Sequence, residues 1–416
     1  MLPLKAAILT LALGTSILLA VSCTDNNAVA PEPTTGAEDR ALPTSDPDFS
    51  TWVAVGDWVR LRGCTVYDEP PLDRFDTGKR CERNDVIARI VDGPYGNGRD
   101  FPFYELEGIG WVNEPDFIDP VDGVSFVSAS HGWAWNIVAE GDSFPLRVYE
   151  TVDGGRGWEA IADLPYERSL FAPFLFVDDT HGWMHVGHYP DGQLLATDDG
   201  GRTWESVWKP ADRYGGDWES YSFVSPERGW RTIPTRLERT DDGGRTWAPL
   251  TYPCDGERQY TAQVSFVSEA AGWILCGTTF GRDDFVLFRT SDAGDTWQPI
   301  VSTGPSRSTN SLGTGAVLIG LRFLDESRGW ISTSEDNGIG GLYATSDGGL
   351  TWSEVAFGAG AEPPFWRFEP PDFVDELTAW MVVSRSNTTP GGLYRTEDGG
   401  ATWALMQPPG DLSASN

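Results

Sequence analysis

Basic residues are scarce in this chain of 416 residues. It holds 30 Lys and Arg against 62 Asp and Glu, for a formal net charge of −32. A protein that binds nucleic acid needs a basic surface to displace counterions from phosphates, so we expect no nucleic-acid partner. The acidity is typical of a soluble, exposed protein, and the alternative is a field that attracts cations or basic partners.

Helical patterns and metal-binding motifs are also missing. No long helical periodicity follows residue 22, and no CxxC pair, glycine-rich phosphate loop or nucleophile elbow occurs. The string "HGWMHVGH" contains His181, His185 and His188, but the last two point to opposite faces of a strand. We therefore predict no metal and no cofactor. The 48 Gly, 29 Pro and 19 Trp instead indicate an all-β protein of short strands and turns.

The chain has one long apolar run, from Ala6 to Val21, which is short for a membrane span and follows a single Lys. The run ends in "AVSC", which resembles the lipobox of bacterial lipoproteins. This resemblance implies a signal peptide over residues 1–22, a lipid on Cys23 and a place in the bacterial cell envelope. The residue after Cys23 is Thr24 rather than Asp, which favours the outer membrane. The alternative is simple cleavage near Ser22, which would leave a free thiol.

Residues 23–50 are polar and rich in Pro, Thr and Asp, so they are predicted to form a disordered tether. Without Cys23, an even number of cysteines remains, which suits an oxidising compartment. The economical arrangement is two local disulfides, Cys64 with Cys81 and Cys254 with Cys276. The alternative for each pair is two unbonded thiols that pack as small apolar side chains.

An internal repeat organises the rest of the chain. The octapeptide "TDDGGRTW" occurs at residues 197–204 and again at 240–247, with looser copies beginning at residues 151, 290, 345 and 396. A second motif precedes each copy, in which a Phe is followed seven residues later by a Trp, usually after a Gly. Six copies with a period near 50 residues predict a repeat architecture. The Phe and Trp pairs are Phe126 and Trp133, Phe176 and Trp183, Phe223 and Trp230, Phe266 and Trp273, Phe323 and Trp330, and Phe373 and Trp380.

The octapeptide has the composition of a tight turn between two strands. Its Asp can accept backbone N–H groups, its glycines supply positive φ angles, and its Thr hydroxyl can add a local bond. We expect its Trp to begin the next strand and to pack flat into the sheet. Each repeat then holds four strands, and the acidic residues have structural rather than catalytic roles. They are Asp153, Asp199, Asp242, Asp292, Asp347 and Asp398.

These motifs resemble the Asp-box, or BNR, repeat, and their combination resembles the photosystem II stability and assembly factor-like family. The resemblance implies a β-propeller over residues 119–408, with six blades from the six repeats and seven as the alternative that the family suggests. Gly157 and Ala293 depart from the box pattern, which puts the local turn in question there. Residues 52–118 lack the repeat, and their strand-like runs resemble a small SH3-like β-barrel.

The connections of variable length lie on the propeller face opposite the invariant turns, and binding sites concentrate on such loops. Aromatic and basic residues gather there. The alternative is that these aromatic side chains only cover blade edges. The candidate binding surface consists of Trp208, Arg213, Trp218, Trp366 and Arg367.

The sequence thus predicts a lipid-anchored envelope protein whose propeller binds another protein as a non-enzymatic scaffold. The partner is an envelope protein or a glycan, and no catalytic residue is assigned. The alternative is a secreted glycoside hydrolase or glycan-binding propeller of the sialidase-like class. The nearest match to a sialidase arginine signature is "WRTIP" at residues 230–234, which is poor, while glycosidases in general need only two suitably placed carboxylates.

Overall fold

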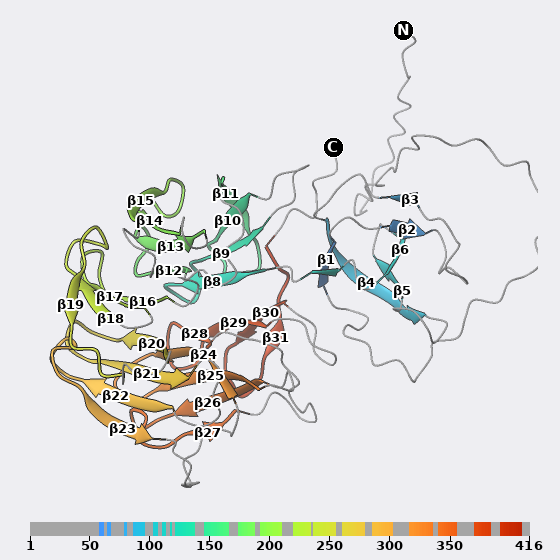
Figure 1. Cartoon of the computed structure of the whole chain (residues 1–416). Helices are drawn as coiled ribbons and strands as arrows, with labels where there is room; N and C mark the ends of the chain where they lie inside the picture. The colour runs from blue at the N-terminus through green and yellow to red at the C-terminus, as the bar shows by residue number, and fades with distance from the viewer. Residues whose placement is uncertain are drawn as a thin grey trace, which may run out of the picture.

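The structure is a computed structural model, and its described propeller residues form six four-stranded antiparallel sheets arranged in a ring (Figure 1). Each sheet is one repeat, with its strands in sequence order. The chain is therefore an all-β, six-bladed propeller, as the repeat count predicts. The described residues are the strands between residues 58 and 118 and residues 121–137, 145–165, 174–187, 192–209, 219–233, 236–254, 260–278, 285–302, 316–335, 340–355, 370–383 and 392–409.

The first three blades contain twelve strands. Blade 1 consists of β8 (Gly123–Phe126), β9 (Gly132–Ile137), β10 (Leu146–Thr151) and β11 (Glu159–Leu164); blade 2 of β12 (Phe174–Phe176), β13 (Gly182–Val186), β14 (Gln193–Thr197) and β15 (Glu205–Trp208); and blade 3 of β16 (Ser220–Phe223), β17 (Gly229–Ile233), β18 (Arg236–Thr240) and β19 (Ala248–Leu250).

The last three blades follow the same plan. Blade 4 consists of β20 (Tyr260–Phe266), β21 (Gly272–Thr278), β22 (Val286–Thr290) and β23 (Gln298–Ser302); blade 5 of β24 (Ala316–Phe323), β25 (Gly329–Glu335), β26 (Gly340–Thr345) and β27 (Ser353–Glu354); and blade 6 of β28 (Asp372–Phe373), β29 (Ala379–Val383), β30 (Gly392–Thr396) and β31 (Ala404–Leu405).

The segment before the propeller forms a separate antiparallel sheet in the order β3-β2-β6-β5-β4-β1-β7. The SH3-like module and the domain limits stay predictions, as do the signal peptide and tether, which lie outside the described residues. Within the described part of the chain, no helix is long and apolar enough to span a membrane. The seven strands are β1 (Trp58–Leu61), β2 (Thr65–Tyr67), β3 (Lys79–Arg80), β4 (Val86–Tyr95), β5 (Phe103–Leu106), β6 (Gly110–Asn113) and β7 (Phe117–Ile118).

The Phe and Trp of the first motif join neighbouring blades. The Trp on the second strand of each blade stacks face to face on the Phe of the following blade. Four of these Trp side chains are fully buried, and such stacked pairs combine large apolar burial with a preferred ring geometry. The ring centroids are separated by 3.7 Å in Trp133–Phe176, 3.8 Å in Trp183–Phe223, 3.6 Å in Trp230–Phe266, 3.8 Å in Trp273–Phe323, 4.1 Å in Trp330–Phe373 and 3.6 Å in Trp380–Phe126.

The Gly before each of these Trp residues has a steric reason. A Cβ atom on Gly132 would lie 2.3 Å from the ring of Phe126 in the same blade, which is far inside van der Waals contact. The corresponding glycines of blades 2 to 5 face the same obstruction. Blade 6 has Ala379 instead, and its Phe373 makes the widest of the six stacks. The Phe, the Gly and the Trp are therefore one packing unit.

The octapeptide forms the expected turn through its own side chains. In blade 1 the Thr151 hydroxyl accepts the N–H of Gly155 at 2.9 Å and donates to Asp153 Oδ1 at 2.9 Å, and the same oxygen accepts the N–H of Gly157 at 2.8 Å. Both box glycines have φ between 72° and 94° in each of the other blades with the full pattern. In blade 4, Ala293 adopts φ 64° and the turn still forms, so this departure does not change the fold.

The Trp of the box packs differently from the sequence prediction. It is half-buried and meets the Phe of its own blade edge-on, as in Phe126–Trp158, with an interplanar angle of 75°. It does not lie flat, because the flat face of that Phe is already covered by the Trp of the neighbouring blade. The box Trp therefore packs against the Phe from a second direction.

The two invariant turns of each blade lie together at one end. In every blade the backbone N–H of the fourth box residue donates to the turn that follows the Phe, as from Gly154 to the carbonyl of Ser130 at 2.8 Å. We call this end the turn face. The other connections fall largely outside the described residues.

Gly157 is the seventh residue of its box, and the other five boxes have Thr at that position. The Thr hydroxyl donates to the Asp carboxylate of the same box, as in Thr203 to Asp199 Oδ2 at 2.6 Å. We expect Gly157→Thr to raise the free energy of unfolding by about 1 kcal/mol, through this bond and a less flexible unfolded chain. Urea unfolding of the full chain measures it, with Gly157→Ala separating the two contributions. Destabilisation by Thr would contradict the prediction.

The box carboxylates are acidified by the turn. The hydroxyl and N–H of Thr296, with the hydroxyl of Thr290, lower the pKa of Asp292 from its ordinary value of 3.8 to about 2. Thr351 and Thr402 lower the pKa of Asp347 and Asp398 in the same way. Partial burial opposes the shift at Asp153, Asp199 and Asp242, yet the hydrogen bonds still lower the pKa of each.

A depressed folded-state pKa stabilises the fold above the unfolded pKa and loses that effect as pH falls. For Asp292 the window runs from about pH 4 down to about pH 2. We expect the urea midpoint to fall steeply in this range, and the difference between wild type and Asp292→Asn to shrink as the pH is lowered. Because the two proteins share all other acidic residues, the difference between them cancels the effect of protonating those residues. A pH-independent difference would show that the turn does not favour the ionised form.

Candidate functional site

Blade 3 breaks the repeat at two positions that hold apolar or aromatic residues in the other five blades. The residue after the buried Trp is apolar in five blades, but in blade 3 it is Arg231. The second residue before the box Thr is Tyr, Leu or Phe in five blades, but in blade 3 it is Glu238. A charged residue at a position that is apolar in the other repeats does not serve packing, so a functional role is expected for it. The apolar equivalents are Ala134, Met184, Ile274, Ile331 and Met381 for the first position and Tyr149, Leu195, Phe288, Tyr343 and Tyr394 for the second.

The two charges form a buried ion pair across the sheet. Arg231 in β17 lies directly opposite Glu238 in β18, and its Nε and Nη2 donate to Glu238 Oε2 at 2.8 and 2.5 Å. Arg231 is 3% exposed and Glu238 8%. The guanidinium lies over the rings of Trp208, at 3.8 Å, and Trp247, at 4.3 Å. Such cation–π contacts fix the guanidinium plane and strengthen when water is excluded.

A second carboxylate lies beside this pair. Glu219 precedes β16, is buried, and accepts a hydrogen bond from the Tyr221 hydroxyl. Its Oε2 is 3.7 Å from His185 Nε2 of blade 2. Burial raises the pKa of Glu219, although the Tyr221 bond and the charge of Arg231 oppose the shift. Burial likewise raises the pKa of Tyr221 well above its usual 10, so its hydroxyl stays a donor.

Two atoms of this group have no hydrogen-bond partner. Glu219 Oε1 and Arg231 Nη1 are both buried and unsatisfied in the described structure. An unsatisfied buried polar atom costs about 1–3 kcal/mol, and more when it belongs to a charged group. One acceptor and one donor inside the junction of blades 2 and 3 therefore lack a hydrogen-bond partner. We call Glu219, Tyr221, Arg231 and Glu238, with His185, Trp208 and Trp247 around them, the Arg231 cluster.

The structure includes one residue of the sequence-predicted surface in this cluster. Trp208 ends β15, is half-buried and packs on Arg231. Arg213, Trp218, Trp366 and Arg367 lie outside the described residues, so the surface as a whole stays a prediction.

The disulfide between Cys254 and Cys276 is present, with the two Cα atoms 5.6 Å apart and both side chains in the core of blades 3 and 4. Cys23, Cys64 and Cys81 lie outside the described residues. Among the described residues, no group of three or more His, Cys, Asp and Glu side chains could hold a metal ion.

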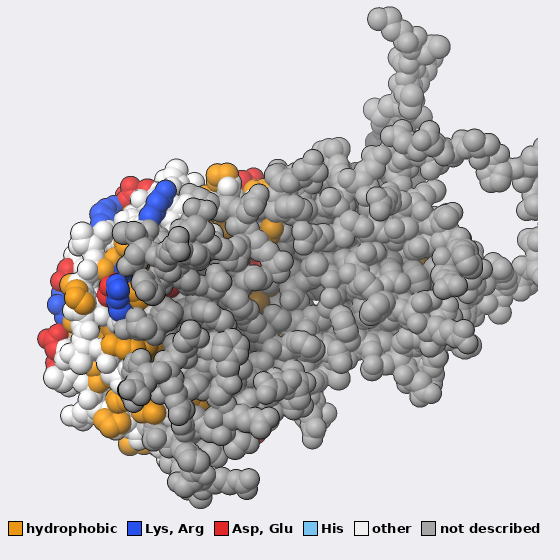
Figure 2. Space-filling view, viewed as in Figure 1, with side chains coloured by type: hydrophobic (Ala, Val, Ile, Leu, Met, Phe, Trp, Pro, Cys, Tyr) orange, Lys and Arg blue, Asp and Glu red, His pale blue; other side chains and the backbone are white. Residues whose placement is uncertain are grey.

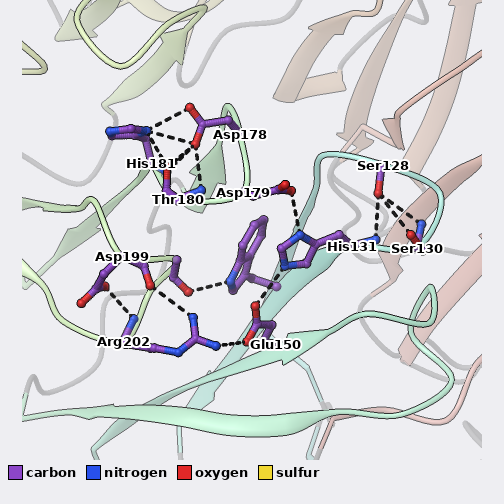
Figure 3. A network of polar contacts seen from close by, with 12 residues as sticks. Ser128, Ser130, His131, Glu150, Asp178, Asp179, Thr180, His181, Asp199 and Arg202 are labelled. Atoms are coloured by element: carbon purple, nitrogen blue, oxygen red, sulfur yellow. Dashed lines mark hydrogen bonds and ion pairs between the residues drawn. The ribbon is translucent and has the colours of Figure 1, made fainter.

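A second polar network joins blades 1 and 2 on the turn face (Figure 3). His131 lies between two carboxylates, with Nδ1 at 2.7 Å from Asp179 and Nε2 at 3.0 Å from Glu150, and Arg202 donates to Glu150 at 2.6 Å. In the neighbouring turn, hydrogen bonds hold the pKa of Asp178 at about 2 against the opposing effect of partial burial. An equivalent pair joins Arg328 to Glu376 at 3.0 Å between blades 5 and 6. The network therefore joins neighbouring blades and has a structural role.

Ion pairs of this kind recur at the surface. On the side of the propeller drawn in Figure 2, acidic and basic side chains lie beside one another along the rim. Exposed pairs such as Arg147 with Asp163, at 2.6 Å, contribute little to stability individually. The buried Arg231 cluster differs from them because it has displaced apolar core residues.

No protein-family model matches the chain, and no curated protein matches it. Several solved structures are similar. "YCF48 bound to D1 peptide" is 19% identical, with 69% of this chain and 81% of that chain covered and a TM-score of 0.40. The GH74 xyloglucanase from Xanthomonas campestris is 14% identical, with 85% and 55% covered and a TM-score of 0.48. The SapL1 lectin in complex with alpha methyl fucoside is 13% identical, with 69% and 96% covered and a TM-score of 0.44.

The similarity is one of propeller architecture. This chain spans about half of the length of the xyloglucanase. A peptide complex, a xyloglucanase and a lectin in complex with a fucoside are among these similar structures.

Sequence reasoning missed four members of the cluster: Glu219, Tyr221, Arg231 and Glu238. The signal was present, because an alignment of the six repeats with one another shows a charged residue at two positions that are otherwise apolar. The string "WRTIP" contains Arg231 at the position that follows the repeat Trp, where the other five repeats have an apolar residue. The comparison of blades within the chain identifies the site without any homologue.

Proposed function

We propose that this protein is a lipid-anchored component of a bacterial cell envelope whose propeller binds a protein partner and catalyses no reaction. The observation that carries the binding role is the Arg231 cluster, a buried polar group with an open donor and an open acceptor in place of apolar core residues. Selection for stability alone would favour the apolar residues of the other blades. Anchoring is supported by "AVSC" and the polar segment after it.

The cluster suits binding better than acid–base catalysis. Glycoside hydrolysis needs a pair of carboxyl groups on opposite sides of the scissile bond. Glu238 is engaged with Arg231 through two hydrogen bonds and Glu219 with Tyr221, inside a sheet junction. Rigid, paired groups of this kind recognise a ligand by position and need not move a proton.

Glycan hydrolysis is the second candidate, and one observation favours it. The raised pKa of Glu219 is the property that a general acid requires near neutral pH.

The two functions are separated by a glycan array and a hydrolysis screen on the full chain, run beside panning of a displayed library of random peptides. We expect peptide ligands and no hydrolysis. Hydrolysis that Glu219→Gln abolishes would replace our proposal with the second candidate. Binding of glycans alone would also overturn it.

The anchor has an independent test, which is mass spectrometry of the mature N-terminus after expression in a bacterial host. We expect a diacyl- or triacyl-modified Cys23 as the first residue, and Cys23→Ser should release the protein from membranes. An unmodified N-terminus at or near Ser22 would contradict the anchor and leave the binding role untouched.

A further inference from the structure

We propose that the Arg231 cluster recognises a carboxamide group, from an Asn or Gln side chain of the bound protein segment. This inference rests on the proposed protein-binding function and specifies the chemistry of the ligand. It begins from the two open atoms, Glu219 Oε1 as an acceptor and Arg231 Nη1 as a donor. Tyr221, which donates to Glu219, lies directly opposite Arg231 in the sheet, so the two groups are neighbours in blade 3.

A carboxamide is the group that satisfies both atoms at once. It offers an N–H donor and a carbonyl acceptor in one plane and carries no charge. A carboxylate ligand would accept from Arg231 but would face two glutamates. An ammonium group would suit Glu219 but would lie against the guanidinium. An apolar side chain would leave both buried atoms without a partner.

The aromatic residues of the cluster favour a side chain over a sugar ring. Trp208 and Trp247 each present a ring face to the cluster, and the Arg231 guanidinium lies over both of those faces. A sugar that stacked on either of these faces would have to displace the guanidinium. A planar amide needs only the two open atoms.

The recognising atoms are also held in place before a ligand arrives. Arg231 is fixed by Glu238 and by the two Trp rings, and Glu219 by Tyr221. Preorganised polar groups lose little entropy on binding. They also discriminate strongly, because a ligand that lacks one partner leaves a buried charged group unsatisfied.

The test uses peptides selected by panning random displayed peptides on the full chain. We expect the selected sequences to share an Asn or Gln at one position. In synthetic peptides, Gln→Glu or Gln→Leu at that position should weaken binding at least about tenfold, the effect of losing a hydrogen bond to a buried charged group. This arm leaves the protein unchanged.

The second arm changes the protein. Arg231→Met with Glu238→Leu, the residues of blade 2, should lower the affinity of the selected peptides by a similar factor, whereas Arg245→Met on the turn face should not. Peptides that bind without an amide preference, or equally well to the double variant, would overturn the carboxamide site and leave the protein-binding function standing. A buried water that bridges Glu219 and Arg231 in crystals of a peptide complex would overturn it in the same way. A chain that binds no peptide fails the proposed function itself, and with it this inference.

Discussion

Replacing Arg231 and Glu238 together by Met and Leu is expected to raise the free energy of unfolding by about 1–4 kcal/mol. The two residues form a buried ion pair whose desolvation offsets most of its attraction, and Arg231 Nη1 lacks a partner. Blade 2 shows that Met and Leu fit these positions, since Met184 and Leu195 are fully buried there. Urea unfolding followed by circular dichroism measures the change.

The single substitutions have the opposite sign. Arg231→Met leaves Glu238 buried without its partner, so we expect a loss of about 3–5 kcal/mol. Arg245→Met, which removes an exposed Arg of the same blade, serves as the control and should change stability by less than about 0.5 kcal/mol. A double variant that is as unstable as the single one would show that the cluster is needed for packing. That outcome would remove the main reason for assigning it a function.

Trp380→Ala is expected to lower the free energy of unfolding by about 3–5 kcal/mol and to open the ring between blades 6 and 1. Trp380 is fully buried, stacks on Phe126 and donates its Nε1–H to the carbonyl of Gly154 at 3.1 Å. The same junction is joined by Asp372, whose Oδ2 accepts the N–H of Phe126 at 2.7 Å. These contacts close the propeller, because each described blade is built from consecutive strands and no strand is exchanged between the first and last blades.

The matched control is Trp273→Ala, which removes an equivalent stack and hydrogen bond between blades 4 and 5. Both variants should lose similar stability, but only Trp380→Ala should increase amide hydrogen exchange at β8 and β28. Trp380→Phe keeps a stacked ring and loses only the Nε1 bond, so we expect a loss of about 1–2 kcal/mol. Uniform exchange in both alanine variants would contradict a special role for this junction.

The sequence by itself determined the features that depend on contacts between near neighbours. The box turn is built by Thr, Asp and Gly within eight residues. Its hydrogen bonds and its six copies could therefore be predicted from the sequence. The number of blades followed from the repeat count. The Cys254–Cys276 bridge agrees with the prediction of two local disulfides.

Only the tertiary structure decided what depends on partners far apart in the chain. The flat stack of each Phe belongs to the preceding blade, so the box Trp meets that Phe edge-on, which a single repeat cannot show. Asp372 bonds the backbone of Phe126, 246 residues away. The sequence shows that Arg231 and Glu238 interrupt the repeat pattern. Their burial and their contact with Trp208 depend on how blades 2 and 3 pack. Turn chemistry is local and repeats with the sequence, whereas closure and the candidate site arise where different blades meet.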